Sequence, residues 1–115
     1  LRLVRLPYHL SAFTQAAAEA ALDHAEALLA TVGDIRVQRD RLVAELRAIG
    51  FDPYRSDSNF VLFGGVSDPE RTFTELLARG VLVRNVGIPN TLRVTAGTEA
   101  ETSAFLEALA ELQAN

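Results

Sequence analysis

The chain has 115 residues, 49% of them hydrophobic, and a net charge of −4, which suits one globular domain and argues against binding to nucleic acid or an anionic membrane. It has no cysteine, which excludes disulfides, thiolate nucleophiles and zinc–thiolate sites. It also has no lysine, because all eleven of its Lys or Arg residues are arginine, so no lysine amine is present to hold an aldehyde cofactor covalently.

The first residues, 1–6, alternate loosely between apolar and polar side chains before Pro7, a pattern that predicts a short strand or extended lead-in. The sequence starts abruptly in this half-apolar segment and contains no methionine, so we expect it to belong to a longer protein. No run of about 18 apolar residues occurs, so we expect no membrane-spanning helix, and residues 1–10 do not have the pattern of a signal peptide. Together with the lack of disulfides, this predicts a cytoplasmic protein without a membrane-spanning helix.

A first helix is predicted after Ser11. The Ser11 side chain is a good N-cap, and residues 12–22 are rich in alanine, which has the highest helix propensity. Propensity alone predicts a plain packed helix here.

A second, long helix is predicted from Asp23 to Ile49. Asp23 followed by Glu26 has the spacing of a capping box, and Gly50 is a natural C-cap. The helix carries a narrow apolar stripe, made of Leu28, Val32, Ile35, Leu42, Leu46 and Ile49. At 1.5 Å per residue it is about 40 Å long, which is out of scale for a self-contained domain of this size. It either forms a coiled-coil-like dimer or connects two domains of a larger protein.

The second half of the chain predicts a small sheet covered by two helices, in the order β-α-β-β-α. The expected strands are residues 60–63, 81–83 and 91–96. Asp68 and Pro69 predict the start of the first helix, which ends at Gly80. A capping box predicts the start of the second. The side chains expected to face the core are Phe73, Leu76 and Leu77 in the first helix and Phe105, Leu106, Leu109 and Leu112 in the second.

Two arginines are the candidate binding residues. Arg93 lies in a predicted strand and points to the face opposite Leu92 and Val94, whereas Arg84 ends the strand before it. Burying an isolated guanidinium is costly, so Arg93 must reach solvent, a carboxylate or an anionic ligand. A surface position or an internal salt bridge stays open for both residues. The functional alternative is a planar fork for a carboxylate or phosphate.

No metal site and no catalytic residue are predicted. His9 and His24 lie far apart on different predicted elements, with no carboxylate at the spacing of a metal ligand. We expect each histidine to be exposed or hydrogen-bonded.

Four segments resemble, in register, the histidinol-phosphate aminotransferases, PLP-dependent enzymes of fold type I, especially their actinobacterial form. The match runs in the same order and covers nearly the whole chain. The segments are Leu6–Ser11 (LPYHLS) with Thr14–Ala18, Ser58–Phe63 (SNFVLF), Gly80–Arg84 (GVLVR) and Leu92–Gly97 (LRVTAG).

The resemblance implies a transamination between histidinol phosphate and 2-oxoglutarate in histidine biosynthesis, with small-molecule substrates. In that family's pattern Arg93 binds the α-carboxylate and in turn the phosphate, Arg84 adds a contact to the phosphate, and Asn59 lies near the substrate pocket. The lysine and other residues that hold pyridoxal 5′-phosphate (PLP) belong upstream of Leu1. This chain alone is therefore expected to bind no PLP covalently and to be inactive, and the full-length enzyme is expected to be a homodimer.

The resemblance also implies an α/β fold with an α+β small domain. Residues 1–50 would be the end of a large domain and the connecting helices, and residues 51–115 a C-terminal small domain with a mostly antiparallel sheet covered by helices. Two alternatives stay open. One is a piece of another fold-type-I enzyme, an aromatic aminotransferase or a threonine-phosphate decarboxylase. The other is a stand-alone α/β ligand-binding module that dimerises through the long helix.

Overall fold

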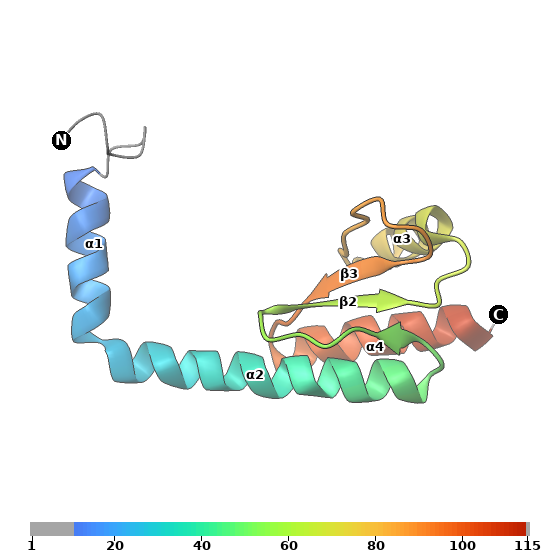
Figure 1. Ribbon diagram of the computed structural model, residues 1–115, viewed down its shortest axis with the longest axis horizontal. Helices are drawn as coiled ribbons and strands as arrows, with labels where there is room; N and C mark the ends of the chain where they lie inside the picture. Colours follow the sequence, from blue (N-terminus) through green and yellow to red (C-terminus); the bar gives the residue numbers. More distant parts are fainter. Residues whose placement is uncertain (1–10, 115) are drawn as a thin grey trace. The chain divides into compact units, whose positions relative to one another are not determined.

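The computed structural model describes residues 11–114 and divides into two compact units, Leu1–Val32 and Gly33–Asn115. The predicted lead-in at residues 1–6 lies outside the described residues. The elements, labelled in Figure 1, are α1 (Ala12–Asp23), α2 (Ala25–Ala48), β1 (Asp52–Pro53), β2 (Phe60–Gly64), α3 (Pro69–Ala78), β3 (Leu92–Thr95) and α4 (Glu99–Ala114).

Helix α1 confirms the helix predicted after Ser11. The Ser11 hydroxyl accepts a 3.0 Å hydrogen bond from the backbone N–H of Thr14, which makes Ser11 the N-cap. None of its residues is buried, and the ring of Phe13 is 89% exposed.

The capping box predicted at Asp23 does not form. Asp23 is the last residue of α1, and the next residue, His24, is its C-cap, with its N–H directed to the carbonyl oxygens of Ala21 and Leu22. An N-cap needs a non-helical backbone, which Asp23 lacks inside α1. Helix α2 starts one residue later, and its first turn is joined to His24 by the 3.1 Å bond from Leu28 N–H to the His24 carbonyl.

The second half of α2 belongs to the second unit, which begins at Gly33. Leu42 and Leu46 are buried, whereas Leu28 at the other end of the stripe is 49% exposed. The described residues thus cover only the C-terminal part of the apolar stripe. The assignment of the two parts to a large and a small domain stays a prediction.

A glycine ends α2 as predicted. Gly50 has φ +100°, the left-handed region that favours glycine. Its N–H donates to the Arg47 carbonyl (3.2 Å), and the N–H of Phe51 donates to the Leu46 carbonyl (3.0 Å). This turn reverses the chain and brings Phe51 into the core.

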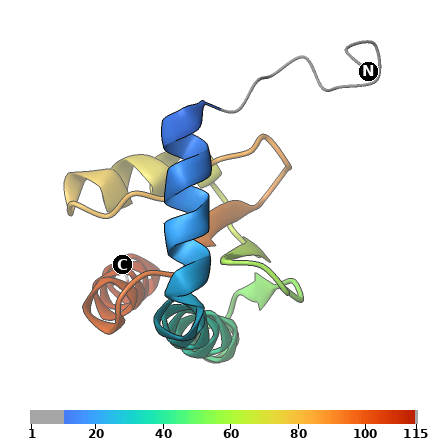
Figure 2. The ribbon, with the colours of Figure 1, turned by 90° about the vertical axis from the view of Figure 1, so that its left-hand side faces the viewer.

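The three strands form an antiparallel sheet in the order β1-β2-β3. Phe60 pairs with Thr95 and Phe63 with Leu92, which fixes the register of the two longer strands. Helices α2 and α4 lie side by side on one face of this sheet, as Figures 1 and 2 show from two directions. The expected α/β class with a small antiparallel sheet is confirmed.

The core lies between this sheet face and the helices. The ring of Phe63 meets the rings of Phe51 and Phe105 edge-on, with centroids 5.6 Å and 6.0 Å away. As predicted, Leu92 and Val94 turn inward from β3. The buried hydrophobic residues are Leu42, Leu46, Phe51, Val61, Phe63, Val66, Leu76, Val83, Leu92, Val94, Ala96, Phe105, Leu106, Ala108 and Leu109.

The two ends of α3 and the start of α4 lie where the sequence predicted them. Asp68 accepts a 3.1 Å bond from the N–H of Arg71, and Gly80, with φ +78°, follows the end of α3. Thr98 and Glu101 form the predicted capping box through bonds of 3.2 Å and 3.4 Å between each side chain and the other residue's N–H.

Two predictions about this unit are wrong, and one strand was missed. Residues 81–83 form no strand, and only the next residue, Arg84, makes an isolated bridge to Arg93. Val83 is buried by apolar packing and not by pairing with another strand. A buried β-branched residue also occurs in strands, which is why the sequence predicted one here. The short edge strand β1 was missed because one of its two residues is proline. Leu77, expected to face inward, is 50% exposed.

The Phe63→Ala substitution should lower the free energy of unfolding of the chain by about 3–5 kcal/mol, because it leaves a cavity between three packed rings. Urea denaturation measures the change. Phe13→Ala, at a surface ring, is the matched control and should change stability by no more than about 0.5 kcal/mol. Equal effects of the two substitutions would contradict the described core.

The Gly80→Ala substitution should lower stability by about 1 kcal/mol, because the residue has a positive φ that alanine adopts only with strain. A Cβ there would have no atom within 4 Å, so no new packing contact would offset the strain. Gly33→Ala, in the interior of α2 and equally unobstructed, should instead raise stability by about 0.5–1 kcal/mol. The shift of the thermal midpoint measures both. The opposite signs are the test, since no surrounding atom crowds a Cβ at either position and only the backbone conformation differs.

Candidate substrate-anion site

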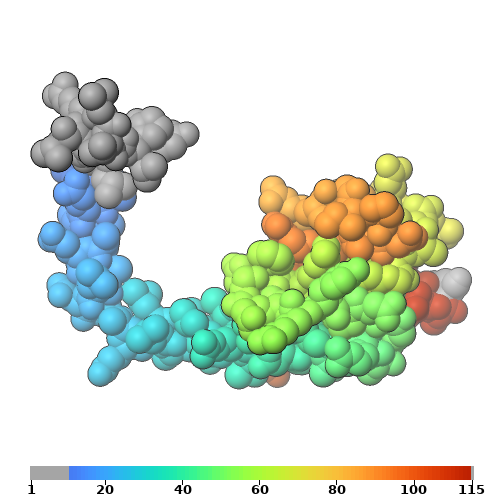
Figure 3. Space-filling model, viewed as in Figure 1, coloured from blue at the N-terminus to red at the C-terminus, as the bar shows by residue number. Residues whose placement is uncertain are grey.

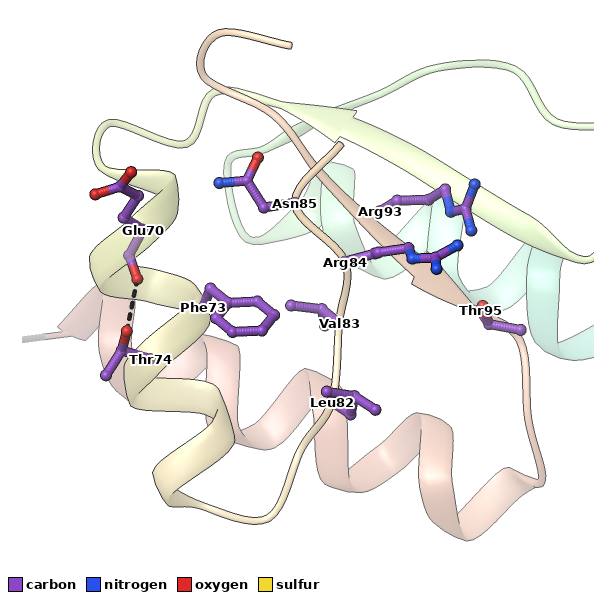
Figure 4. Close-up of a pocket in the computed structure, with 9 residues that line it drawn as sticks. All are labelled: Glu70, Phe73, Thr74, Leu82, Val83, Arg84, Asn85, Arg93 and Thr95. Atoms are coloured by element: carbon purple, nitrogen blue, oxygen red, sulfur yellow. Dashed lines mark hydrogen bonds between the residues drawn. The ribbon is translucent and has the colours of Figure 1, made fainter. Parts of the chain in front are cut away.

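Arg84 and Arg93 are paired across two neighbouring backbone segments. The N–H of each donates to the carbonyl oxygen of the other, both at 2.8 Å, as in a hydrogen-bonded antiparallel pair. Side chains of directly opposed residues leave the same face of the sheet. Figure 4 shows both side chains running alongside each other, with their guanidinium ends on the same side.

Neither guanidinium group forms an ion pair with a carboxylate among the described residues. Every salt bridge found in residues 11–114 uses another arginine. Like charges directly opposite one another in a sheet are destabilising, and arginine stays protonated in proteins. The pair therefore presents two adjacent positive charges, the arrangement that a carboxylate or phosphate would neutralise.

A hollow of about 780 Å³ lies beside the pair, within the size range of small-molecule sites. Both polar and apolar side chains line it: Glu70, Phe73 and Thr74 from α3, Leu82, Val83, Arg84 and Asn85 from the following segment, and Arg93 and Thr95 from β3. Glu70 is the acid in this lining, and Figure 4 shows it on α3, away from the guanidinium ends. Residues 84–90 are all exposed and lie in the orange surface of Figure 3.

Arg93 is the more enclosed of the two arginines. It is half-buried, whereas Arg84 is exposed. Its Cζ lies 4.5 Å from the centre of the Phe60 ring, within the range of a cation–π contact. Its Nε is buried and has no hydrogen-bond partner among the described residues.

The third predicted residue, Asn59, is not brought into the hollow. It is exposed at the start of β2, and its carbonyl oxygen accepts a 2.8 Å bond from the N–H of Ala96. Its side chain does not line the hollow, so its role in binding substrate stays a prediction.

Several residues that line the hollow or contact Arg93 were missed at the level of sequence. Thr95 lies two residues after Arg93, and strand alternation alone places it on the same face. Phe60 follows Asn59 in the quoted motif, but its contact with Arg93 depends on the register of β2 and β3. Phe73 and Thr74 reach the hollow only because of where α3 lies, which no local pattern in the sequence specifies.

Five other arginines form ion pairs with carboxylates in the described part of the chain. Nε of Arg71 donates to Glu75 at 2.9 Å, and this hydrogen bond with the nearby carboxylate raises the pKa of Arg71 above its ordinary value. Over residues 11–114, no cluster of His, Cys, Asp or Glu is arranged to hold a metal ion. No helix in that range is long and apolar enough to cross a membrane.

The family model for aminotransferase class I and II matches residues 1–109. Among curated relatives, a histidinol-phosphate aminotransferase of Paenarthrobacter aurescens is 65% identical over 112 residues, 97% of this chain and 30% of that protein. One of Streptomyces avermitilis is 57% identical over 113 residues, 98% of this chain and 31% of that protein. The chain thus spans about 30% of the length of these relatives.

Solved structures give the same result. The histidinol-phosphate aminotransferase from Sinorhizobium meliloti, in complex with pyridoxal-5′-phosphate, has a TM-score of 0.83 at 24% identity, over 98% of this chain and 33% of that one, and shows the fold alone. A putative aminotransferase from Burkholderia pseudomallei has a TM-score of 0.77 at 35% identity, over 83% of this chain and 30% of that one. The resemblance stated from four short segments is confirmed, and the chain belongs to the aminotransferase class I and II family.

Proposed function

We propose that this chain is the C-terminal, substrate-binding part of a PLP-dependent aminotransferase that exchanges an amino group between histidinol phosphate and 2-oxoglutarate. The observation that supports it best is the Arg84–Arg93 pair, two guanidinium groups on one sheet face beside a hollow, with no carboxylate partner among the described residues. The curated relatives named for this activity, 57–65% identical over nearly the whole chain, support the same substrate class.

Each proposed substrate carries an anionic group, a carboxylate or a phosphate, that the enzyme must bind. Arg93 would bind the α-carboxylate of glutamate or 2-oxoglutarate, and the phosphate of the other substrate in its turn. Arg84 would give the phosphate a second contact. A guanidinium donates two parallel hydrogen bonds, which fit both a planar carboxylate and the oxygens of a phosphate. Two adjacent forks therefore suit a site that takes these groups alternately.

The chain's candidate residues fit the substrate side of a PLP enzyme and not the binding of the cofactor itself. PLP supplies the electron sink that stabilises the substrate carbanion when it is bound. The chain has no lysine to hold the cofactor covalently, and its candidate residues are anion ligands. In this proposal the cofactor-binding residues come from the rest of the longer protein, while Arg84 and Arg93 orient the substrate toward the reacting carbon.

The remaining expectations are parts of the same proposal. The full-length enzyme would be a cytoplasmic homodimer. The match over nearly all of the chain to longer aminotransferases favours this reading over a stand-alone module that dimerises through α2. Among fold-type-I enzymes, the relatives quoted above favour histidinol phosphate over an aromatic or threonine-phosphate substrate.

In the full-length protein, the Arg93→Ala substitution should lower kcat/KM for glutamate by roughly 30- to 5,000-fold, about 2–5 kcal/mol, because a carboxylate would lose a charge-assisted fork in a partly buried site. Steady-state kinetics measure the change, and the PLP absorbance should show that the cofactor is still bound. The matched control is Arg55→Ala, whose exposed side chain pairs with Asp57 at 3.6 Å and should have little effect. Unchanged kinetics with glutamate would refute the role of Arg93.

The Arg84→Ala substitution should discriminate between the two substrates. We expect kcat/KM to fall about tenfold or more for histidinol phosphate, because one hydrogen bond to a charged group is lost, and to change much less for glutamate. The same assays measure both values. A larger loss for glutamate than for the phosphate substrate would contradict the assignment of Arg84 to the phosphate.

A further inference from the structure

The ring of Phe60 lies directly against the guanidinium of Arg93. Phe60 pairs with Thr95, two residues after Arg93, so the ring and the guanidinium are diagonal neighbours on one sheet face. The 4.5 Å from Cζ to the ring centre is a close cation–π contact. Leu62, which is directly opposite Arg93, is aliphatic and offers no such electrostatic attraction.

Burial of Nε leaves one edge of the Arg93 guanidinium available. Nε is buried and has no acceptor in the described part of the chain. The two terminal nitrogens of Arg93 are not buried without a partner, and neither forms a hydrogen bond with the described residues. A guanidinium can donate to an anion through its Nε edge or through its two terminal nitrogens. Because the Nε edge is closed, an anion at Arg93 must approach end-on, between Nη1 and Nη2.

Arg93 needs such support because of its neighbour. Arg84 is its directly opposed partner, and repulsion between the two positive charges favours conformations in which the side chains move apart. The negative face of an aromatic ring attracts the Arg93 guanidinium and opposes this movement. A side chain already held in its binding conformation loses less conformational entropy when the anion binds.

We infer that Phe60 is a positioning residue, which holds the Arg93 guanidinium over its ring so that only the terminal nitrogens face an incoming carboxylate or phosphate. The inference rests on the proposed function, because it specifies how Arg93 binds the substrate anion. It assigns to the Asn-Phe segment a role for the phenylalanine, in addition to the expected role of Asn59.

The test uses three variants of the full-length protein with PLP bound. Phe60→Leu keeps an apolar side chain but removes the ring, and Phe60→Tyr keeps the ring. Tyr54→Leu removes an exposed ring just after β1, which has no cation–π contact among the described residues. We expect Phe60→Leu to raise KM for glutamate and Ki for inorganic phosphate by about 3- to 30-fold, with kcat retained. Phe60→Tyr and Tyr54→Leu should stay within about twofold of the parent.

A double-mutant cycle separates positioning from a general structural effect. If Phe60 acts through Arg93, adding Phe60→Leu to Arg93→Ala should change Ki for inorganic phosphate by less than about twofold. The same 3- to 30-fold loss in both backgrounds, or a loss with Phe60→Tyr equal to that with Phe60→Leu, would overturn the inference. Where turnover is too slow to measure Ki, equilibrium titration gives the Kd for inorganic phosphate instead.

The outcomes also distinguish the inference from the proposed function. If Arg93→Ala weakens glutamate and phosphate but Phe60→Leu does not, Arg93 binds the anion and Phe60 does not position it. If neither substitution changes the binding of these anions, the proposed role of Arg93 itself fails, and the inference fails with it.

Discussion

The backbone pairing of Arg84 with Arg93 is the constraint on which the candidate site depends. Two hydrogen bonds of 2.8 Å hold the segment before β3 against β3 itself, although no regular strand forms there. Because the pair is directly opposed, both side chains must leave on one face. A loop could place a single arginine at this edge, but only such a pairing holds two guanidinium groups side by side at a defined separation.

The core determines which face the arginines occupy. Leu92 and Val94 are buried on the inner face of β3, against helices α2 and α4, so alternation directs Arg93 to the outer face. A register shift of one residue would place the guanidinium among the packed rings and expose two large apolar side chains. The ring cluster around Phe63 therefore maintains the binding geometry without contacting the hollow.

The sequence predicted the parts of this arrangement that depend on local pattern. Alternation around Arg93, the Asp68 cap and the glycine after α2 were all correct, because each depends on residues within one or two turns of chain. The pairing of Arg84 with Arg93 was not predicted. The sequence predicted a strand at residues 81–83, but these residues are apolar because of packing and form no strand. The contact of Phe60 with Arg93 and the residues that α3 adds to the hollow depend on register and topology, which no local pattern in the sequence specifies.

The repulsion that makes the arginine pair unfavourable for folding is also the source of its affinity for anions. Any carboxylate placed permanently beside Arg84 and Arg93 would stabilise the fold and compete with a substrate for the same donors. The described residues instead offer a ring, which attracts the guanidinium of Arg93 but accepts no hydrogen bond from its terminal nitrogens. An aromatic partner therefore orders the side chain and leaves its charge for the ligand, which an acidic partner could not do.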